Sequence, residues 1–180
     1  MDIIINALYT DKQVFLRELI STPSESQQEE AIALRVRKEM LELNYDSVDI
    51  DRFGNVIGRI GSGPTRILFD AHLDTPGIGD KASWRFDPYK GDMKAGKIYG
   101  HGAANNKGGL AAIIYAGAVI KELDLADECT IFVVGSVQAE SCEGLAYKCI
   151  FDVEKHLVGK LAVGYFSITE TILSSTETLV

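Results

Sequence analysis

His72 and Asp74, two polar residues with the spacing of a metal site, follow a short apolar stretch at residues 65–69. Residues two apart point to the same side of an extended chain, so a strand ending here would present an imidazole and a carboxylate together. This arrangement is typical of a metal-ligating histidine whose ring is held by an acidic partner. A lone His-x-Asp also fits the polar end of a strand that faces water, so the pair alone leaves both interpretations open.

Strand and helix patterns alternate around this pair and predict the frame that positions it. Strands of period two and helices of period 3.6 in alternation indicate an α/β sandwich with a largely parallel sheet. The expected helices cover residues 4–20, the run up to Leu43, 110–123 and 143–155, and the expected strands lie at 48–60 (two, around 53–55), 65–69, 130–137 and 161–168.

A capping box is expected before the second helix, with Ser26 accepting from the first-turn amides and Glu29 reaching back. The run that follows is amphipathic. Its core-facing residues are expected to be Ile32, Val36, Met40 and Leu43, and its solvated charges Arg35, Arg37, Lys38, Glu39 and Glu42.

Three potential metal ligands fall at the ends of three expected strands. His72 closes one strand, Glu140 follows the next apolar strand, and Glu170 follows the last. In an open α/β sheet, ligands bind outside the carboxyl ends of the strands. The sequence therefore predicts a metal site at this edge.

The composition of the chain argues against some classes of binding partner. The 180 residues fit one domain, and the formal net charge of −8 without a basic cluster argues against nucleic acid and an anionic membrane. Three cysteines without a C-x-x-C spacing favour reduced thiols and a cytoplasmic location. An acidic start and the lack of an apolar run of ~18 residues predict a soluble protein without a signal peptide or membrane span.

Four motifs carry a family resemblance: 70–76 (DAHLDTP), 99–109 (YGHGAANNKGG), 138–144 (QAESCEG) and 168–170 (ITE). In this order and spacing they resemble the acetylornithine deacetylase, succinyl-diaminopimelate desuccinylase, aminoacylase and carboxypeptidase family of co-catalytic zinc metallopeptidases. The 137–144 run, with Trp84 and Pro88, is most similar to the branch linked to selenium metabolism. The resemblance implies a three-layer α/β sandwich with a mostly parallel mixed sheet.

The resemblance also implies roles and a substrate class. His72 would ligate one metal ion, with Asp74 as the catalytic-site residue that orients its ring, and Glu140 and Glu170 would be further ligands. Asn105 stands at the position of the aspartate that bridges two metals. The implied cofactor is Zn²⁺, one or two ions, with Co²⁺ or Mn²⁺ as alternatives. The implied substrate is a small-molecule N-acyl amino acid or peptide.

Two positions depart from the family pattern in a way that bears on chemistry. Asn105 supplies a neutral amide where a bridging carboxylate is expected, and Ala139 stands where the general base is expected. Loss of a general base lowers a rate by about 10²–10⁴. His101, in place of arginine, and Thr171-Ile172 depart as well.

We therefore expect residues 1–180 to be the amino-terminal portion of a zinc-peptidase-like catalytic domain, without the lid or dimerisation domain and the carboxyl-terminal half. The expected function is a metal-dependent hydrolase of amide bonds, impaired in this chain. The alternative is a non-catalytic truncated relative that acts as a binding or partner-interaction module. An uncovered sheet edge could also pair with a second copy of the chain, so a homo-oligomer is a further alternative. A thiol enzyme built on Cys142 is disfavoured because no histidine adjoins it.

Overall fold

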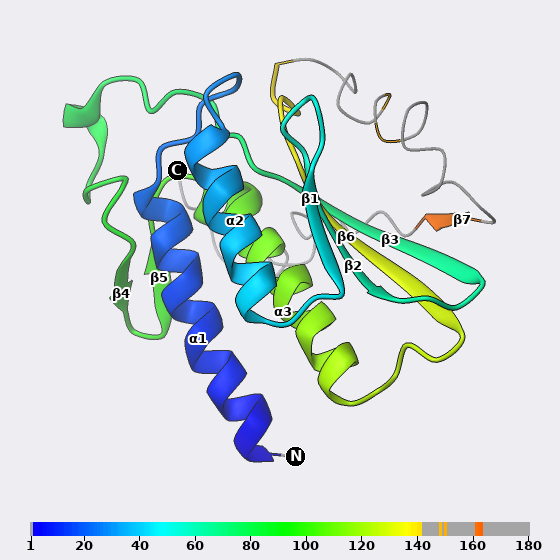
Figure 1. The fold of residues 1–180 in the computed structure, drawn as a ribbon. Helices are drawn as coiled ribbons and strands as arrows, with labels where there is room; N and C mark the ends of the chain where they lie inside the picture. Colours follow the sequence, from blue (N-terminus) through cyan, green and yellow to red (C-terminus); the bar gives the residue numbers. More distant parts are fainter. Residues whose placement is uncertain (1, 142–147, 149, 151–160, 164–180) are drawn as a thin grey trace.

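The computed structural model describes residues 2–141, 148, 150 and 161–163 (Figure 1). The helices are α1 (Asp2–Ser21), α2 (Glu30–Glu42) and α3 (Gly108–Glu122), with short helical turns η1 (Lys81–Ser83) and η2 (Ala103–Lys107). The strands are β1 (Ser47–Ile50), β2 (Val56–Gly61), β3 (Thr65–His72), β4 (Asp92–Lys94), β5 (Lys97–Tyr99), β6 (Cys129–Ser136) and β7 (Leu161–Val163). The chain is α/β, as the alternating patterns predict.

A mixed sheet of five strands forms the centre, in the order β1-β2-β6-β3-β7. The β1–β2 and β2–β6 pairs are antiparallel, whereas β3 runs parallel to both β6 and β7. In the register of β3 and β6, His72 lies opposite Ser136. The carboxyl ends of these two strands therefore meet at one edge, where the sequence predicts the site.

Each face of the sheet carries a buried apolar cluster. On one face α2 and α3 cover the strands, and α1 packs on these two helices (Figure 1). The core on this side contains Phe15, Val36, Met40, Ile114 and Val133 among its buried residues. The opposite face carries a second buried cluster of Ile57, Leu68, Phe132, Val134 and Ile150. Burial on both faces explains why β6 is continuously apolar in sequence.

The expectation that Glu39 is solvated is wrong. Glu39 is 7% exposed, and its carboxylate accepts hydrogen bonds from the Tyr115 hydroxyl and from Arg35 Nη2, the latter at 2.7 Å. Arg35 also pairs with Glu18 and lies 4.7 Å from the centre of the Phe15 ring. The reason is tertiary: α1 and α3 cover this side of α2, so a charge there must be paired. Ile32, Val36 and Met40 are fully buried, as predicted.

The long loop after β3 folds back onto the domain. Trp84 Nε1 donates to the Ile78 carbonyl at 2.9 Å, and β4 and β5 form a small hairpin. The expected helix at 143–155 is described only at residues 148 and 150, and both are helical. Of the last expected strand, residues 161–163 are described. Cys142, Cys149 and Glu170 lie outside the described residues.

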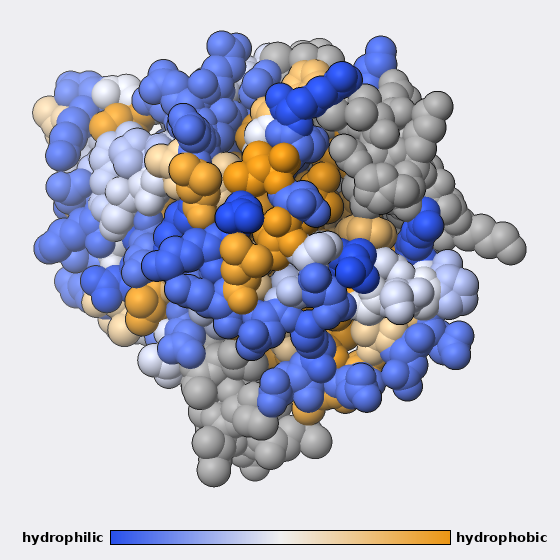
Figure 2. All heavy atoms as spheres, in the orientation of Figure 1, coloured by the Kyte–Doolittle hydropathy of each residue, from blue (hydrophilic) through white to orange (hydrophobic). Residues whose placement is uncertain are grey.

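The surface seen in Figure 2 is mostly hydrophilic, with an apolar area over α2 and β1. Leu34 and Leu41 of α2 and Ile50 of β1 are exposed large hydrophobic residues. Over the part of the chain that the structure describes, none of the helices combines the length and the apolar character needed to cross a bilayer.

Candidate metal centre

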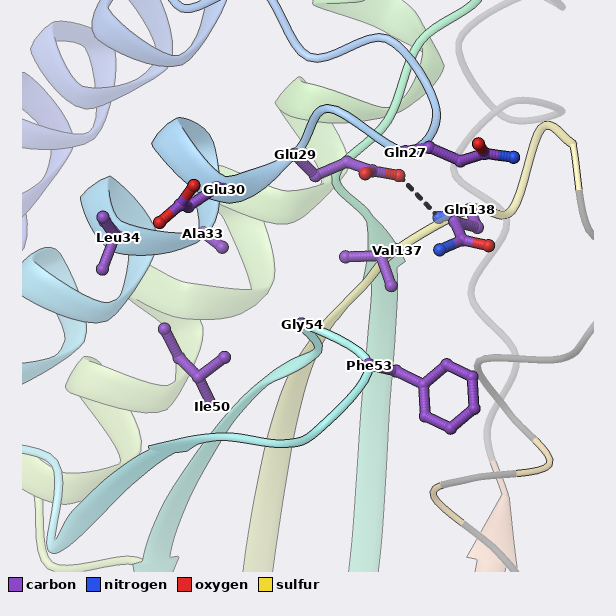
Figure 3. Close-up of a pocket in the computed structure, with 10 residues that line it drawn as sticks. All are labelled: Gln27, Glu29, Glu30, Ala33, Leu34, Ile50, Phe53, Gly54, Val137 and Gln138. Atoms are coloured by element: carbon purple, nitrogen blue, oxygen red, sulfur yellow. Dashed lines mark hydrogen bonds between the residues drawn. The ribbon is translucent and has the colours of Figure 1, made fainter.

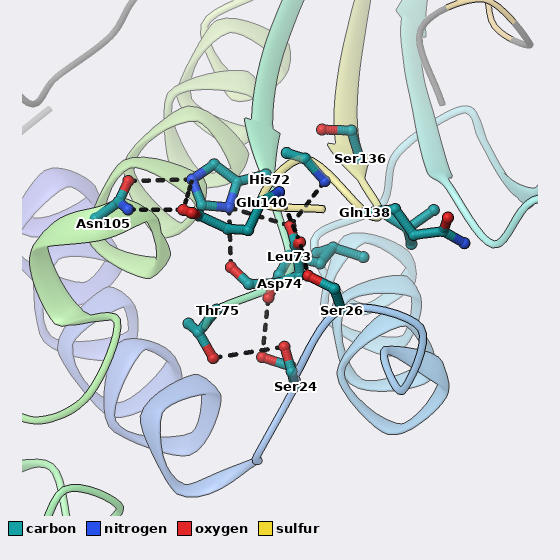
Figure 4. A network of polar contacts seen from close by, with 12 residues as sticks. Ser24, Ser26, His72, Leu73, Asp74, Thr75, Asn105, Ser136, Gln138 and Glu140 are labelled. Atoms are coloured by element: carbon teal, nitrogen blue, oxygen red, sulfur yellow. Dashed lines mark hydrogen bonds and ion pairs between the residues drawn. The ribbon is translucent and has the colours of Figure 1, made fainter. Parts of the chain in front are cut away.

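The candidate site lies where β3 and β6 end side by side (Figure 4). His72 is the last residue of β3, and the amide of Leu73 still donates to the Ser136 carbonyl, at 2.7 Å. Glu140 follows four residues after the end of β6. Parallel pairing thus brings together two residues that are 68 positions apart in the sequence.

The His72 ring is surrounded by oxygen atoms. Its Nδ1 lies 2.9 Å from the main-chain oxygen of Asp74 and 3.3 Å from Oδ1 of the same residue. Its Nε2 lies 3.1 Å from Asn105 Oδ1 and 3.7 Å from Glu140 Oε1. Burial by itself lowers the pKa of His72, but the contacts with Asp74 and Asn105 outweigh it and raise the pKa. The contacts of the ring therefore favour its protonated form.

Asp74 is the buried centre of the network. It is 0% exposed, and its carboxylate accepts hydrogen bonds from Ser26 Oγ at 2.6 Å, the Glu140 amide at 2.9 Å and the Ala139 amide at 3.2 Å. Burial by itself raises the pKa of Asp74, but His72, Ser26 and the Glu140 amide lower it to about 2. Asp74 is thus a charged anchor that touches both strand ends.

Asn105 connects the two potential ligands. Its Nδ2 donates to Glu140 Oε1 at 2.8 Å, while its Oδ1 faces His72 Nε2. Lys107, at the end of the same turn, is 1% exposed and donates from Nζ to the carbonyls of Leu19 and Thr22, at 2.8 and 2.9 Å. Burial lowers the pKa of Lys107 to about 8. The lysine ties the Asn105 turn to the carboxyl-terminal end of α1, where a cation is favoured by the helix dipole.

His101 holds the loop that follows Asp74. Its Nε2 lies 2.7 Å from the Pro76 carbonyl, and its amide donates to the Pro88 carbonyl at 2.6 Å. The ring is 9% exposed and packs edge-on against Trp84 and Tyr89. His101 therefore links the turn after β3 to the long loop.

Two oxygen atoms lie near His72 Nε2 at separations that can be compared with those of metal ligands. Nitrogen and oxygen ligands about 2 Å from a tetrahedral Zn²⁺ lie about 3.3 Å from one another. The separations of His72 Nε2 from Asn105 Oδ1 and Glu140 Oε1, 3.1 and 3.7 Å, bracket that value. Among residues 2–141, 148, 150 and 161–163, however, no group of three or more His, Cys, Asp and Glu side chains is placed to hold a metal ion. The potential ligands among the described residues are thus two ionisable side chains, His72 and Glu140, and one amide, Asn105.

The predicted capping box is wrong, and its two residues belong to the site instead. Helix α2 begins at Glu30, after an N-cap residue, Glu29, whose side chain makes no capping hydrogen bond. Ser26 Oγ donates to Asp74 Oδ2, and Glu29 Oε1 accepts from the Gln138 amide at 2.9 Å. Both side chains therefore bind tertiary partners in place of helix amides. Nothing local in a Ser-x-x-Glu pattern distinguishes these two outcomes.

Comparison with known proteins agrees with the motifs. The profile described as "Peptidase family M20/M25/M40" matches residues 68–175. The chain is 44% identical over 142 residues to the uncharacterized protein YgeY of Escherichia coli K12, which covers 79% of this chain and 35% of that protein. A succinyl-diaminopimelate desuccinylase of Methylocella silvestris is 45% identical over 62 residues, 34% of this chain and 16% of that enzyme.

A solved structure shows the same fold. The M20 family metallo-carboxypeptidase Sso-CP2 of Sulfolobus solfataricus superposes with a TM-score of 0.70 at 17% identity, over 87% of this chain and 36% of that one. The chain spans about a third of the length of its relative in Escherichia coli. The motifs, the profile match and the fold lead to one conclusion: the chain belongs to peptidase family M20/M25/M40, a family of metal-dependent hydrolases.

Proposed function

We propose that this chain carries part of the metal centre of a zinc-dependent hydrolase acting on amide bonds of N-acyl amino acids or small peptides, and that its own hydrolytic step is impaired. The observation that carries the proposal is the convergence of His72, Asn105 and Glu140 at the paired ends of β3 and β6. The desuccinylase among the relatives supports an N-acyl substrate.

Each described residue has a distinct role in this proposal. His72 Nε2 and Glu140 would hold a metal ion, with the Asn105 oxygen beside them. Asp74 keeps the Nδ1 side of the His72 ring engaged, so that Nε2 faces the site. When bound, Zn²⁺ polarises an amide carbonyl and lowers the pKa of a water molecule. Glu170, outside the described residues, is proposed as a further ligand.

The proposed impairment follows from two side chains. A methyl group at Ala139 cannot take up a proton, so the step that a general base performs has no group at that position. Asn105 offers one neutral oxygen, because its nitrogen donates to Glu140. A neutral amide does not offset the repulsion between two divalent cations as a carboxylate does.

A second candidate function is a non-catalytic binding module. It is favoured by the hydrogen bonds that Asn105 makes with His72 and Glu140. The amide accepts at the His72 side and donates at the Glu140 side, so it links the two potential ligands by hydrogen bonds alone. An aspartate there would face Glu140 with like charge. The two candidates therefore differ in whether this cluster exchanges its hydrogen bonds for a metal ion.

The test combines metal analysis with turnover. Elemental analysis after equilibration with Zn²⁺, Co²⁺ or Mn²⁺ is paired with a panel of N-acyl amino acids, for wild type, Asn105→Asp, Ala139→Glu and the double variant. We expect one ion or less per wild-type chain, turnover at the limit of detection, and higher metal content in variants carrying Asn105→Asp.

Each outcome decides between the candidates. Fast turnover by the wild type would refute the impairment. A wild type and double variant that both fail to bind metal would favour the binding module. A double variant that binds two ions without turnover would show that the defect is not confined to positions 105 and 139.

A further inference from the structure

Four consecutive backbone amides after β6 are each bound by a side chain. The amide of Val137 donates to Asn55 Oδ1 at 3.0 Å, and that of Gln138 donates to Glu29 Oε1 at 2.9 Å. The next two amides, of Ala139 and Glu140, donate to the two carboxylate oxygens of Asp74. The turn that carries Glu140 is thus held by side chains from three distant segments.

The three acceptors are fixed in place by burial. Asn55 and Asp74 are 0% exposed and Glu29 is 5% exposed. Asn55 is oriented in turn by Asp51, which accepts from its Nδ2 at 2.7 Å. Hydrogen bonds to ionised carboxylates are shorter and roughly twice as strong as neutral ones. A turn held in this way has little freedom to shift.

Gln138 is the strained position of the turn. Its φ is +56°, in the left-handed region that non-glycine residues rarely adopt. Such a conformation persists only when surrounding contacts hold it. The hydrogen bond from the Gln138 amide to Glu29 acts directly at this residue.

Glu29 and Asp74 are also linked to each other through the segment before α2. Ser26, three residues before Glu29, donates its hydroxyl to Asp74 Oδ2. The short segment 26–29 therefore connects the two carboxylates. One belongs to Glu29 and accepts from the Gln138 amide, and the other belongs to Asp74 and accepts from the Glu140 amide. Figure 3 shows Glu29 reaching from the start of α2 to the Gln138 amide.

We propose that Glu29 is a positioning residue for Glu140. It holds the left-handed turn at Gln138, and the turn places the Glu140 carboxylate against Asn105 Nδ2 and within 3.7 Å of His72 Nε2. The role of Glu29 in the turn is independent of any metal. Its consequence for metal affinity rests on the proposed function.

Glu30 provides a matched control. It neighbours Glu29 and lines the same cavity of about 480 Å³, but it is exposed and belongs to the first turn of α2. Glu30→Ala removes one negative charge from the same surface without touching the turn. Glu29→Gln keeps the length of the side chain and an oxygen acceptor but removes the charge. Glu29→Asp keeps the charge but shortens the side chain by one methylene. Comparing the two variants separates the effect of side-chain length from that of charge.

The experiment measures backbone amide exchange and the Asn105 side-chain amide resonance by NMR in the metal-free chain. We expect Glu29→Ala and Glu29→Asp to speed exchange at Gln138 by about 10- to 100-fold, as loss of a hydrogen bond to a charged group does. The same variants should shift the Asn105 Nδ2 resonance. Glu29→Gln should recover most of the protection, and Glu30→Ala should match the wild type. If Glu29→Ala fails to fold, Glu29→Asp decides.

A parallel Co²⁺ titration, followed by absorbance, keeps the two proposals separable. Where the wild type binds Co²⁺, Glu29→Asp should weaken binding by about 10- to 100-fold, as loss of an outer partner of a metal ligand does. Folded Glu29→Ala and Glu29→Asp variants with wild-type exchange at Gln138 and an unshifted Asn105 resonance would overturn the positioning role. A wild type and an Asn105→Asp/Ala139→Glu double variant that both fail to bind Co²⁺ would count against the proposed function, while the exchange data still decide the role of Glu29.

Discussion

The turns that follow β3 and β6 lie side by side but are secured by different means. After β3, main-chain bonds dominate: the Leu73 amide donates to Ser136, and the Thr75 amide donates to Ser24. After β6, the amides of residues 137–140 all donate to side chains. His72 therefore lies on a turn that the backbone holds, and Glu140 on one that three side chains hold.

The two turns therefore respond differently to substitution. A main-chain hydrogen bond survives most changes of side chain, whereas a side-chain acceptor is lost with a single substitution. Asp74 is the exception that serves both turns, because it contacts the His72 ring and also accepts from Ala139 and Glu140. We expect the Glu140 side to be the more fragile one and Asp74 to be the most sensitive position.

The largest effect is expected for Asp74→Asn, which tests whether one residue supports both turns. The amide nitrogen would face donors, and the buried hydrogen bonds from Ser26, Ala139 and Glu140 would be weakened or lost together. We expect a loss of roughly 3 kcal/mol in the free energy of unfolding, measured by urea titration. A loss below about 1 kcal/mol would mean that the two turns do not depend on Asp74.

A pH dependence of stability is the next effect in size. The pKa of Asp74 in the folded chain is about 2, below the ordinary value near 4, so its charged form favours folding above about pH 4. This contribution, about 2 kcal/mol, is lost as the pH falls from about 4 to 2. The difference in unfolding free energy between the wild type and Asp74→Asn should therefore shrink by that amount over this range. A constant difference would contradict the lowered pKa.

A pair of alanine variants compares the two turns directly, and one of the pair has the smallest expected effect. Asn55→Ala removes the acceptor of the buried Val137 amide, and we expect a loss of about 2 kcal/mol. Ser24→Ala removes one hydroxyl bond to the Leu73 carbonyl but leaves the main-chain bonds, and we expect about 0.5–1 kcal/mol. Thermal and urea unfolding of both variants measure the difference. Equal losses would show that the two turns are secured equally.

Most of the frame was predictable from sequence because its signals are local or periodic. The strand expected at 65–69, which the structure extends to His72, the continuous apolar strand β6 and the buried helix α3 all follow from hydrophobic patterns. The expected convergence of His72 and Glu140 followed from strand ends meeting at one edge, and the structure brings them to 3.7 Å. Glu170, the third expected ligand, lies outside the described residues.

The misassigned residues share one physical cause. Ser26 and Glu29 fit a capping pattern, and Glu39 fits a solvated helix face, yet each is satisfied by a partner far away in sequence. A buried polar group takes the partner that lets it leave water without an unsatisfied charge, and that choice depends on which segments pack together.

The sequence by itself thus determined the α/β frame and the pair His72 and Asp74 at a strand end, because these depend on residue type and period. The departures at Asn105 and Ala139 came from comparing the sequence with the family that it resembles. Only the tertiary structure decided that Asp74 and Glu29 hold the turn of Glu140, and that Asn105 links Glu140 to His72. Those contacts join segments between 33 and 109 residues apart, so they depend on how the chain folds, which no local pattern encodes. The contacts of Asp74 and Glu29 also involve buried carboxylates, whereas those of Asn105 lie at the surface.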